Sequence, residues 1–345
     1  MHTLAIRMNS SKLQSFQPAK SISPVSLSQS FPVNPAYTLP PSQIPKVPRE
    51  ATQTWREMAL DSDDQVIRIG MLVSLSLSAL GSLFVAAVYL YFADIRSFAF
   101  KLVFYLSLMD LGHAIGFFLP PGESIMCQIQ AAVTSYFSLA SVLWTGIIAF
   151  ALYLAVLKDK RDIEKLELRF VLFANGVPFL ALVPPLVQQK YGGAEGWCWI
   201  VTNGDYYVQG TVWRVVTFYL PLWLVVALNS FVYYKIIKNV RQDVGLLGSD
   251  FEMAQKLIQK LRMYPLILIF CYTLATINRI YDFFSPTSMN FWLTFLSAVM
   301  MNLCGLLNAV VYGFTNTVRL RIKQWFQGGS GQEVSATGSI NSAEV

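Results

Sequence analysis

The sequence predicts an all-α membrane protein in which seven transmembrane helices form a bundle. Hydrophobic residues make up 54% of the 345 residues and charged residues only 13%, a more apolar composition than that of ordinary soluble domains. A membrane-spanning helix needs about 20 mostly apolar residues, and five uncharged runs can each hold one: 69–93, 124–157, 170–189, 215–234 and 283–318. Two further apolar segments, 102–119 and 264–284, are interrupted by Asp110 and Arg279 respectively. Together these segments predict seven spans.

The segment before the first span, residues 1–64, is rich in Ser, Pro and Gln. Such a composition buries too little apolar surface to offset the entropy lost on ordering, so we expect a disordered tail. Asn9 begins an Asn-Ser-Ser pattern, which accepts an N-linked glycan if the tail is extracellular.

The transmembrane domain is expected over residues 65–315, with spans at 67–92, 100–119, 127–157, 170–187, 212–240, 264–284 and 290–314. Pro120 and Pro121 end the second span, because proline cannot continue a helix. Residues 191–207 are predicted to form a loop with aromatic residues and glycines. Ser249 and Glu252 form a capping box that opens a cytoplasmic extension of the sixth span.

Residues 316–327 are predicted to form a short amphipathic helix on the membrane surface. Val318, Ile322, Trp325 and Phe326 would face lipid, and Arg319, Arg321 and Lys323 would face lipid phosphates. The remaining residues, 328–345, are rich in Gly and Ser and are expected to be a flexible cytoplasmic tail.

The distribution of Lys and Arg predicts the topology. The connections after the first, third, fifth and seventh spans carry most of these residues, whereas the opposite loops carry Lys190 and Arg214. Basic loops stay in the cytoplasm, so we expect a multi-pass protein of the plasma membrane with its N-terminus outside. The same distribution explains the net charge of +6 without nucleic acid as a partner.

Two of the four cysteines are expected to form a disulfide. Cys127 lies at the outer end of the third span and Cys198 in the long outer loop, so both face an oxidising compartment in this topology. Cys271 and Cys304 lie within spans and are expected to be inert packing residues.

Asp110 lies deep in the second span, where a carboxylate must pair, become protonated or coordinate an ion. Ser107, His113, Ser141 and Asn308 are its candidate partners. Two interpretations are open: a hydrogen-bonded structural knot, or a polar switch that binds sodium.

Asn308 and Tyr312 close the seventh span. Residues four apart share a helix face, so these two side chains could move between alternative hydrogen bonds. They are assigned to the switch together with Asp110 and Ser141.

A polar cluster near the outer end of the sixth span is the candidate ligand site. Arg279 either snorkels and pairs with Asp282, or points into the outer cavity as a binding cation beside Asn278. The other candidates are Arg214 and three aromatic residues expected around the same mouth: Tyr136, Trp213 and Trp292. Aromatic residues are frequent at membrane interfaces without any ligand.

Enzymes and cofactor proteins are not indicated. The chain has no HExxH or GxSxG motif and no Gly-rich phosphate loop, and its histidines are His2 and His113. No cofactor or metal is therefore expected. A seven-helix transporter or channel remains an alternative, although no pair of broken helices is evident. An adhesion or scaffold protein that signals through its N-terminal tail is a second alternative.

The motifs resemble those of the cyclic-AMP-receptor-like (class E) family of G-protein-coupled receptors. The resemblance covers about residues 65–326 and is carried by KLVFYLSLMDLG, the GWCWI loop, YPLILIFCYTLATINRIYDF and NLCGLLNAVVYG. The third span ends in ALYLAVLKDKRD, without the DRY triplet of the rhodopsin-like class, and the sixth lacks CWxP.

This resemblance implies a receptor that transduces an extracellular ligand signal to a heterotrimeric G protein. A small molecule, with a cyclic nucleotide as one candidate, would bind among the outer ends of the spans, and Pro221 and Pro265 would act as kinks. Basic residues at the cytoplasmic ends would face the G protein: Lys158, Arg241, Lys256, Lys260 and Arg262. Membrane lipids are the remaining expected partner.

Overall fold

The computed structural model describes residues 62–328 except 120–124, 159, 161, 195, 203–206, 243–262, 286–289 and 314. Asn9 and most of the predicted tail, the capping box, Lys256, Lys260, Arg262, and the C-terminal tail beyond 328 lie outside the described residues. Arg241 belongs to a described helix, but its side chain is outside the described set.

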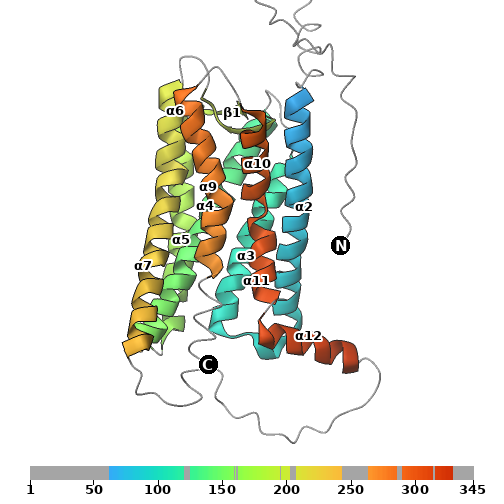
Figure 1. Cartoon of the computed structure of the whole chain (residues 1–345), viewed down its shortest axis with the longest axis vertical. Helices are drawn as coiled ribbons and strands as arrows, with labels where there is room; N and C mark the ends of the chain where they lie inside the picture. The colour runs from blue at the N-terminus through green and yellow to red at the C-terminus, as the bar shows by residue number, and fades with distance from the viewer. Residues whose placement is uncertain are drawn as a thin grey trace, which may run out of the picture. The chain divides into compact units, whose positions relative to one another are not determined.

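The described residues form a bundle of helices that run side by side along its long axis (Figure 1). Six helical spans are long and apolar enough to cross a membrane, and a bent pair of helices makes a seventh. The helices are α2 (Ser62–Tyr91), α3 (Phe98–Phe117), α4 (Ile125–Leu157), α5 (Glu167–Val187), α6 (Tyr207–Arg214) continuing into α7 (Leu220–Gln242), α9 (Met263–Phe284), and the pair α10 (Phe291–Asn302) and α11 (Cys304–Gly313). Short 3₁₀ turns, η2 (Ala93–Ile95) and η3 (Ile163–Leu166), lie in two of the connections. The predicted seven-helix class is confirmed, and α2 begins three residues before the predicted boundary at 65.

The seventh span is broken, whereas the sequence predicted one continuous helix. α10 and α11 meet at Leu303 with a bend of 40°. The Leu303 amide donates to the carbonyl of Met300, three residues back, which tightens the turn at the break. Beyond it, Gly305 lets α11 approach α2 and α3 closely, because a Cβ there would collide with Ser78 and Ser82 of α2 and crowd the Asp110 Cβ of α3.

The fifth span begins at Tyr207, earlier than predicted, and contains a π-helical turn, η5 (Val215–Tyr219). Pro221 lies two residues beyond the end of this turn. Proline lacks an amide hydrogen and its ring crowds the carbonyl four residues back, here that of Thr217, so a wider turn accommodates it. The expected kink at Pro221 therefore takes the form of a π turn.

A β-hairpin occupies the region that was predicted to be a loop. β1 (Tyr191–Ala194) and β2 (Trp197–Ile200) are antiparallel, with Tyr191 opposite Ile200 and Ala194 opposite Trp197. Gly196 in the turn has a φ of +85°, a conformation that glycine adopts without strain. The predicted disulfide is confirmed: Cys127 at the start of α4 is bonded to Cys198 in β2.

α4 lies at the centre of the bundle. It packs against α3, α5, α7, α9 and both strands of the hairpin. Its buried face continues from Cys127 to Leu152, and Trp144 is almost completely enclosed. One helix therefore touches both the hairpin and the opposite end of the bundle.

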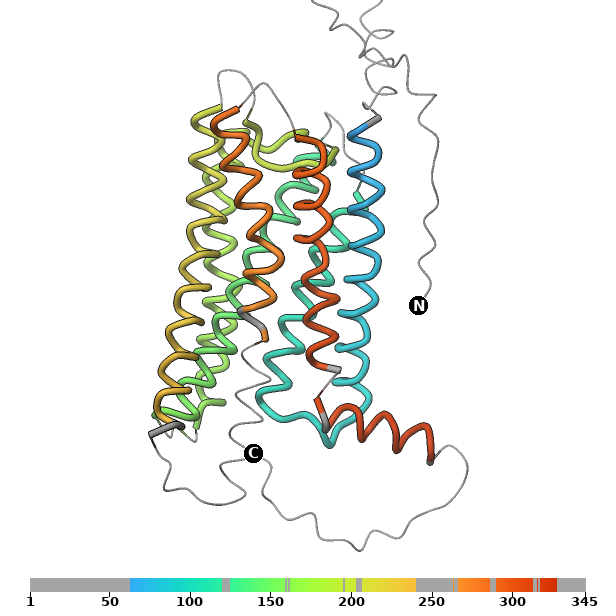
Figure 2. Tube along the Cα trace, in the orientation of Figure 1, coloured from blue at the N-terminus to red at the C-terminus, as the bar shows by residue number. Residues whose placement is uncertain are grey.

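The predicted amphipathic helix is α12 (Asn316–Gly328), which turns across the end of the bundle (Figure 2). Its Arg321 pairs with Asp94 in η2 at 2.8 Å, and the Trp325 indole donates to the Tyr91 hydroxyl at 3.1 Å. Trp325 and Phe326 are exposed, as expected of lipid-facing residues. Val318 and Ile322 were also expected to face lipid. Val318 is 0% exposed and Ile322 is half-buried against the same core cluster, because the first half of α12 packs under the bundle core.

Candidate functional site

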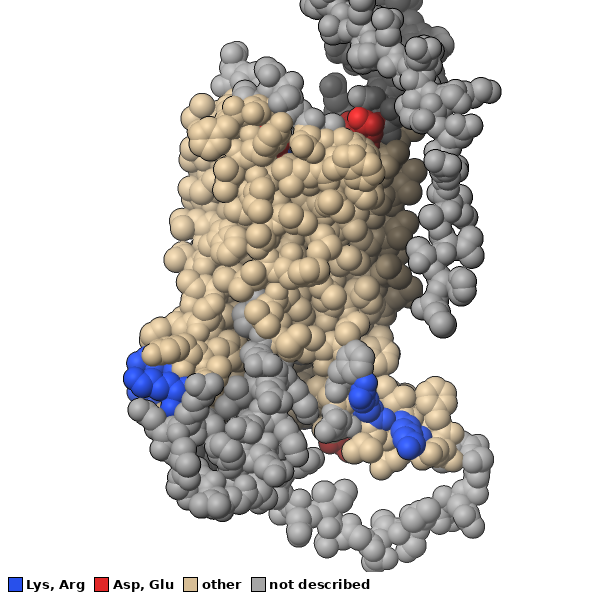
Figure 3. Space-filling view, viewed as in Figure 1, with Lys and Arg blue, Asp and Glu red and all other residues tan. Residues whose placement is uncertain are grey.

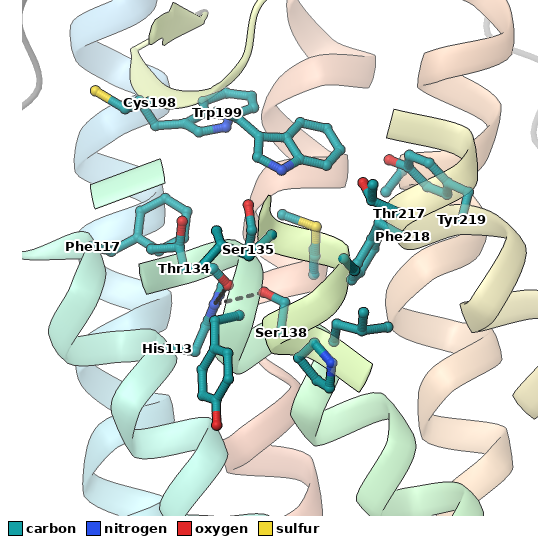
Figure 4. Close-up of a pocket in the computed structure, with 18 of the residues that line it drawn as sticks. His113, Phe117, Thr134, Ser135, Ser138, Cys198, Trp199, Thr217, Phe218 and Tyr219 are labelled. Carbon is teal, nitrogen blue, oxygen red and sulfur yellow. Dashed lines mark hydrogen bonds between the residues drawn. The ribbon is translucent and has the colours of Figure 1, made fainter. Parts of the chain in front are cut away.

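A cavity lies in the half of the bundle that carries the hairpin (Figure 4). It has an empty volume of about 750 Å³, open solvent at its mouth included. Side chains of α3, α4, α5, η5, α9, α10 and the hairpin line it. Indole, phenyl and phenol rings and several hydroxyls form its walls, so it suits a small ligand with apolar surface and hydrogen-bonding groups.

The hairpin is fixed over this cavity by more than the disulfide. The Cys198 amide donates to Oε1 of Gln130 in α4 at 3.1 Å. The other end of the same side chain donates to the carbonyls of Leu119 (2.7 Å) and Phe117 (3.1 Å) at the end of α3. Gln130 therefore joins α3, α4 and the hairpin. Burial raises the pKa of the hairpin residue Tyr191 to about 12, so its phenol stays neutral at physiological pH.

Arg214 was a candidate ligand contact, but it lies behind the cavity wall. Its Nε donates to the carbonyl of Ile200 at 2.9 Å, and its guanidinium stacks 4.7 Å from the ring of Trp199. Trp199 lines the cavity and Arg214 does not. The position of Arg214 is set by the hairpin, which the sequence did not reveal.

Arg279 lines the cavity and is the one Lys or Arg among the described lining residues. Its Nη1 is 2.8 Å from Oδ2 of Asp282, and its guanidinium lies 5.9 Å from the ring of Trp197. Asp282 and Asn278 do not line the cavity. Asn278 is 0% exposed and accepts from Thr294 at 3.4 Å, so it faces α10.

The three aromatic candidates occupy different places. Tyr136 lines the cavity, and its hydroxyl donates to Asn175 of α5 at 2.9 Å. Trp213 donates to Gln188 at 3.1 Å and packs behind the hairpin. Trp292 is 67% exposed and lies outside the cavity wall. Only Tyr136 therefore keeps its place as a candidate on the cavity wall.

His113 and Ser138 lie deep in the cavity, joined by a hydrogen bond in Figure 4. The sequence pointed to His113 only as a partner of Asp110. In the structure its ring contacts Ser138 Oγ at 2.8 Å and Asn302 Oδ1 at 3.1 Å. His113 lies three residues after Asp110, one helical turn nearer the outer end of the same span. This spacing was the signal that could have identified His113 as a cavity residue.

Arg68 is a second residue that the sequence interpretation overlooked. It is a cation near the outer end of α2, and it lines a separate small hollow beside Trp197 and Gly196. No group of three or more His, Cys, Asp or Glu residues in the described part of the chain is arranged to hold a metal.

Comparison with known proteins gives the family. The family model described as slime mold cyclic AMP receptor matches residues 97–324, which is more than half of the chain. The chain belongs to this family. It is 36% identical to G-protein coupled receptor 1 of Arabidopsis thaliana over 260 residues, covering 72% of this chain and 78% of that protein.

A Dictyostelium discoideum protein, cyclic AMP receptor-like protein A, is 28% identical over 256 residues, covering 73% of this chain and 66% of the relative. The crystal structure of squid rhodopsin superposes with a TM-score of 0.63 at 11% identity, covering 85% of this chain and 91% of rhodopsin. The latter similarity concerns the fold alone.

The protein is therefore a multi-pass membrane receptor of the G-protein-coupled type. A G protein and an extracellular ligand are its kinds of partner, and the receptor fold points away from an enzyme. The transporter or channel alternative is not favoured.

Hydrogen-bonded polar side chains surround Asp110 in the middle of this receptor. Its carboxylate accepts hydrogen bonds from Ser141 of α4 at 2.5 Å and from Asn308 of α11 at 2.9 Å. Ser107 instead donates to the carbonyl of Phe104. Tyr312 is buried against Phe100, and its hydroxyl has no hydrogen-bond partner among the described residues.

The end of the receptor opposite the hairpin is basic. Lys and Arg residues gather at the end of α7 and along α12, including Lys235, Lys238, Arg319 and Lys323 (Figure 3). Lys158 is exposed just beyond α4. Lys101 of α3 pairs with Glu167 of α5 at 2.6 Å and joins two spans near this end.

Proposed function

We propose that a small extracellular molecule binds in the cavity under the hairpin and that the bundle passes the signal to a heterotrimeric G protein at the basic end. The observation that carries this proposal is the cavity itself, which is roofed by a disulfide-tied hairpin and bordered by six helical segments of the bundle. A site that contacts many spans is sensitive to their relative positions, so its occupation can bias their arrangement.

The proposed location is the plasma membrane, with the hairpin and the N-terminus outside. Two observations support this orientation. The disulfide lies at the hairpin end, where an oxidising compartment would maintain it. The basic residues of α7 and α12 lie at the other end, as the positive-inside rule requires of cytoplasmic segments. Asn9 would then be available for glycosylation, and α12 would contact lipid headgroups.

A cyclic nucleotide is the candidate ligand that the names of the relatives suggest. Arg279 supports it as a cation on the cavity wall, and the rings of Trp197 and Trp199 could stack on a purine. Arg279 already pairs with Asp282, so a phosphate would have to share the guanidinium with that carboxylate. Tyr136 is the other predicted binding residue on the wall.

The proposed G-protein surface consists of the basic ends of the helices. Lys158 is exposed at the end of α4, and α7 continues beyond Lys238 to Arg241 and Gln242. Lys256, Lys260 and Arg262 would complete this surface. Asp110, Ser141, Asn308 and Tyr312 lie between the cavity and this end, and we assign them to the switch.

The test is nucleotide exchange by the purified full-length receptor in lipid nanodiscs. GTPγS uptake by a set of co-expressed Gα subunits is measured with cyclic AMP and cyclic GMP as probes. Arg279→Ala should raise the half-maximal concentration about tenfold or more, because a charge-assisted hydrogen bond is lost.

Arg68→Ala is the matched control, since Arg68 is an outer cation that does not line this cavity. It should leave the response within about twofold of the parent. If the two variants lose sensitivity to the nucleotide equally, Arg279 does not contact the ligand. Absence of accelerated uptake with every Gα, with or without nucleotide, would contradict the coupling itself.

A further inference from the structure

The contacts of His113 connect the cavity floor with the broken seventh span. Nδ1 lies 2.8 Å from Ser138 Oγ and 3.3 Å from the Thr134 carbonyl, and Nε2 lies 3.1 Å from Asn302 Oδ1. Ser138, Thr134 and His113 all line the cavity, whereas Asn302 does not (Figure 4). The ring therefore has one nitrogen toward the ligand space and one toward α10.

These neighbours determine which nitrogen carries the proton. The Asn302 amide nitrogen donates to the carbonyl of Ala298 at 2.9 Å, so its oxygen is the atom turned toward the histidine. An amide oxygen only accepts, so Nε2 must be the protonated nitrogen in a neutral ring. Nδ1 is then an acceptor, and the Ser138 hydroxyl is the donor that suits it. The Thr134 carbonyl, 3.3 Å from Nδ1, is a second acceptor and is kept from repelling Nδ1 only while Ser138 donates.

Asn302 is the last residue of α10, and the 40° bend follows at Leu303. One turn deeper in α3, Asp110 accepts from Asn308 of α11. Residues three apart in α3 therefore hold the two halves of the seventh span, His113 the half before the bend and Asp110 the half after it. A change at His113 acts on one half only.

We propose that His113 is a ligand-sensing hydrogen-bond switch, and that the ligand operates it by presenting a hydrogen-bond acceptor to Ser138. This inference rests on the proposed ligand cavity, whose sensing residue it names. A phosphate oxygen and a carbonyl oxygen both supply the required chemistry.

The switch transfers no proton. When the Ser138 hydroxyl turns to the ligand acceptor, Nδ1 loses its donor and faces the Thr134 carbonyl acceptor to acceptor at 3.3 Å. This contact is unfavourable, so the ring turns away from Thr134. The turn breaks the hydrogen bond from Nε2–H to Asn302 Oδ1, and the end of α10 loses its hydrogen bond to α3.

Cys304, the residue after the break, is a native probe of this movement. It is a buried free thiol at the start of α11. The full-length receptor carrying Cys271→Ala would have Cys304 as its one free thiol, because Cys127 and Cys198 are bonded. The rate of labelling by N-ethylmaleimide then reports how often the break opens.

Ser138→Ala removes the donor to Nδ1 and should raise the labelling rate about three- to tenfold without any ligand. Ser138→Thr keeps the hydroxyl and should restore the parental rate. Asn302→Leu should raise the rate similarly, and the double variant should exceed neither single variant, because both act through one contact. Thr217→Val, which removes a cavity hydroxyl bonded only to its own helix, is the control and should have no effect.

Labelling in Ser138→Ala that stays within twofold of the Thr217→Val control would overturn the switch, as would additive effects of Ser138→Ala and Asn302→Leu. The measurement uses neither ligand nor G protein, so its failure is distinguishable from failure of the nucleotide-exchange assay. Ser138→Ala is a small change that should leave the fold intact, so the proposal can still be tested if Asn302→Leu yields no folded receptor.

Discussion

The hairpin roof and the inner half of the bundle satisfy their polar groups in opposite ways. In the roof, Gln130 makes three hydrogen bonds to backbone groups, and Arg214 is bonded and stacked. In the inner half, Asn229 of α7 is 0% exposed, yet neither of its amide atoms has a hydrogen-bond partner within the described chain. The Trp144 indole nitrogen and the Tyr312 hydroxyl are likewise buried without one there.

This difference sets the roof apart from the helices below it, where Nδ2 of Asn278 near the outer end of α9 is also without a hydrogen-bond partner among the described residues. Buried polar groups are almost always paired, and each one that is not costs free energy in the state observed. A paired roof preserves one geometry for a ligand. Unpaired groups in the inner half lower the relative cost of a second arrangement in which they find partners, as a bistable element requires.

The largest expected effect is loss of the disulfide in the roof. Cys127→Ser should destabilise the receptor by about 2–5 kcal/mol and sharply reduce the yield of folded protein. Thermal unfolding of the purified receptor measures it. The Cys127→Ser, Cys198→Ser double variant should lose no more than the single one, and a larger loss would mean that the two thiols act separately.

Next comes Gln130→Leu, which leaves the Cys198 amide and the carbonyls of Leu119 and Phe117 without their partner. We expect a loss of about 2–4 kcal/mol, because several buried groups lose hydrogen bonds together. The midpoint of thermal unfolding should fall by about 5–10 °C. An unchanged midpoint would show that water replaces these bonds and that the roof is less rigid than the structure indicates.

Asn229→Leu should have the opposite sign. A leucine, which has the same branched shape and the same number of side-chain heavy atoms, removes an unpaired amide, so stability should rise by about 1–2 kcal/mol. Asn175→Leu is the matched control. Asn175 is an amide that both accepts from Tyr136 and donates to the Val171 carbonyl, and its loss should destabilise. If both substitutions destabilise the receptor, Asn229 does not cost stability and the proposed difference between paired and unpaired amides is wrong.

The smallest effect is expected for Tyr312→Phe, which should change stability by less than about 0.5 kcal/mol because the lost hydroxyl makes no bond here. Tyr136→Phe should cost about 1 kcal/mol, since its hydroxyl bonds to Asn175. If Tyr312 pairs only in the activated arrangement, Tyr312→Phe should lower ligand-stimulated GTPγS uptake despite this neutral stability. Full uptake would remove Tyr312 from the switch.

The sequence predicted the contacts of a site residue correctly where those contacts depend on how far the residue lies from the end of its helix. Asp110, Ser141 and Asn308 lie at matching depths in three spans, and they meet. Arg279 and Trp292 are both near the outer end, yet one borders the cavity and the other faces outward. Depth can be counted from the sequence, whereas the rotation of a helix about its axis depends on how its neighbours pack.

The sequence by itself determined the seven spans, their expected direction and the disulfide, because hydropathy, basic loops and redox compartment act residue by residue along the chain. Only the tertiary structure decided that the outer loop is a hairpin roof, that Arg214 supports Trp199 from behind, and that the seventh span breaks at Leu303. It also showed that His113 bonds to Asn302. Apart from the pairing of the two hairpin strands, which is local, these features arise from close contact between separate segments of the chain, where a backbone carbonyl, a ring face or a missing Cβ sets the geometry.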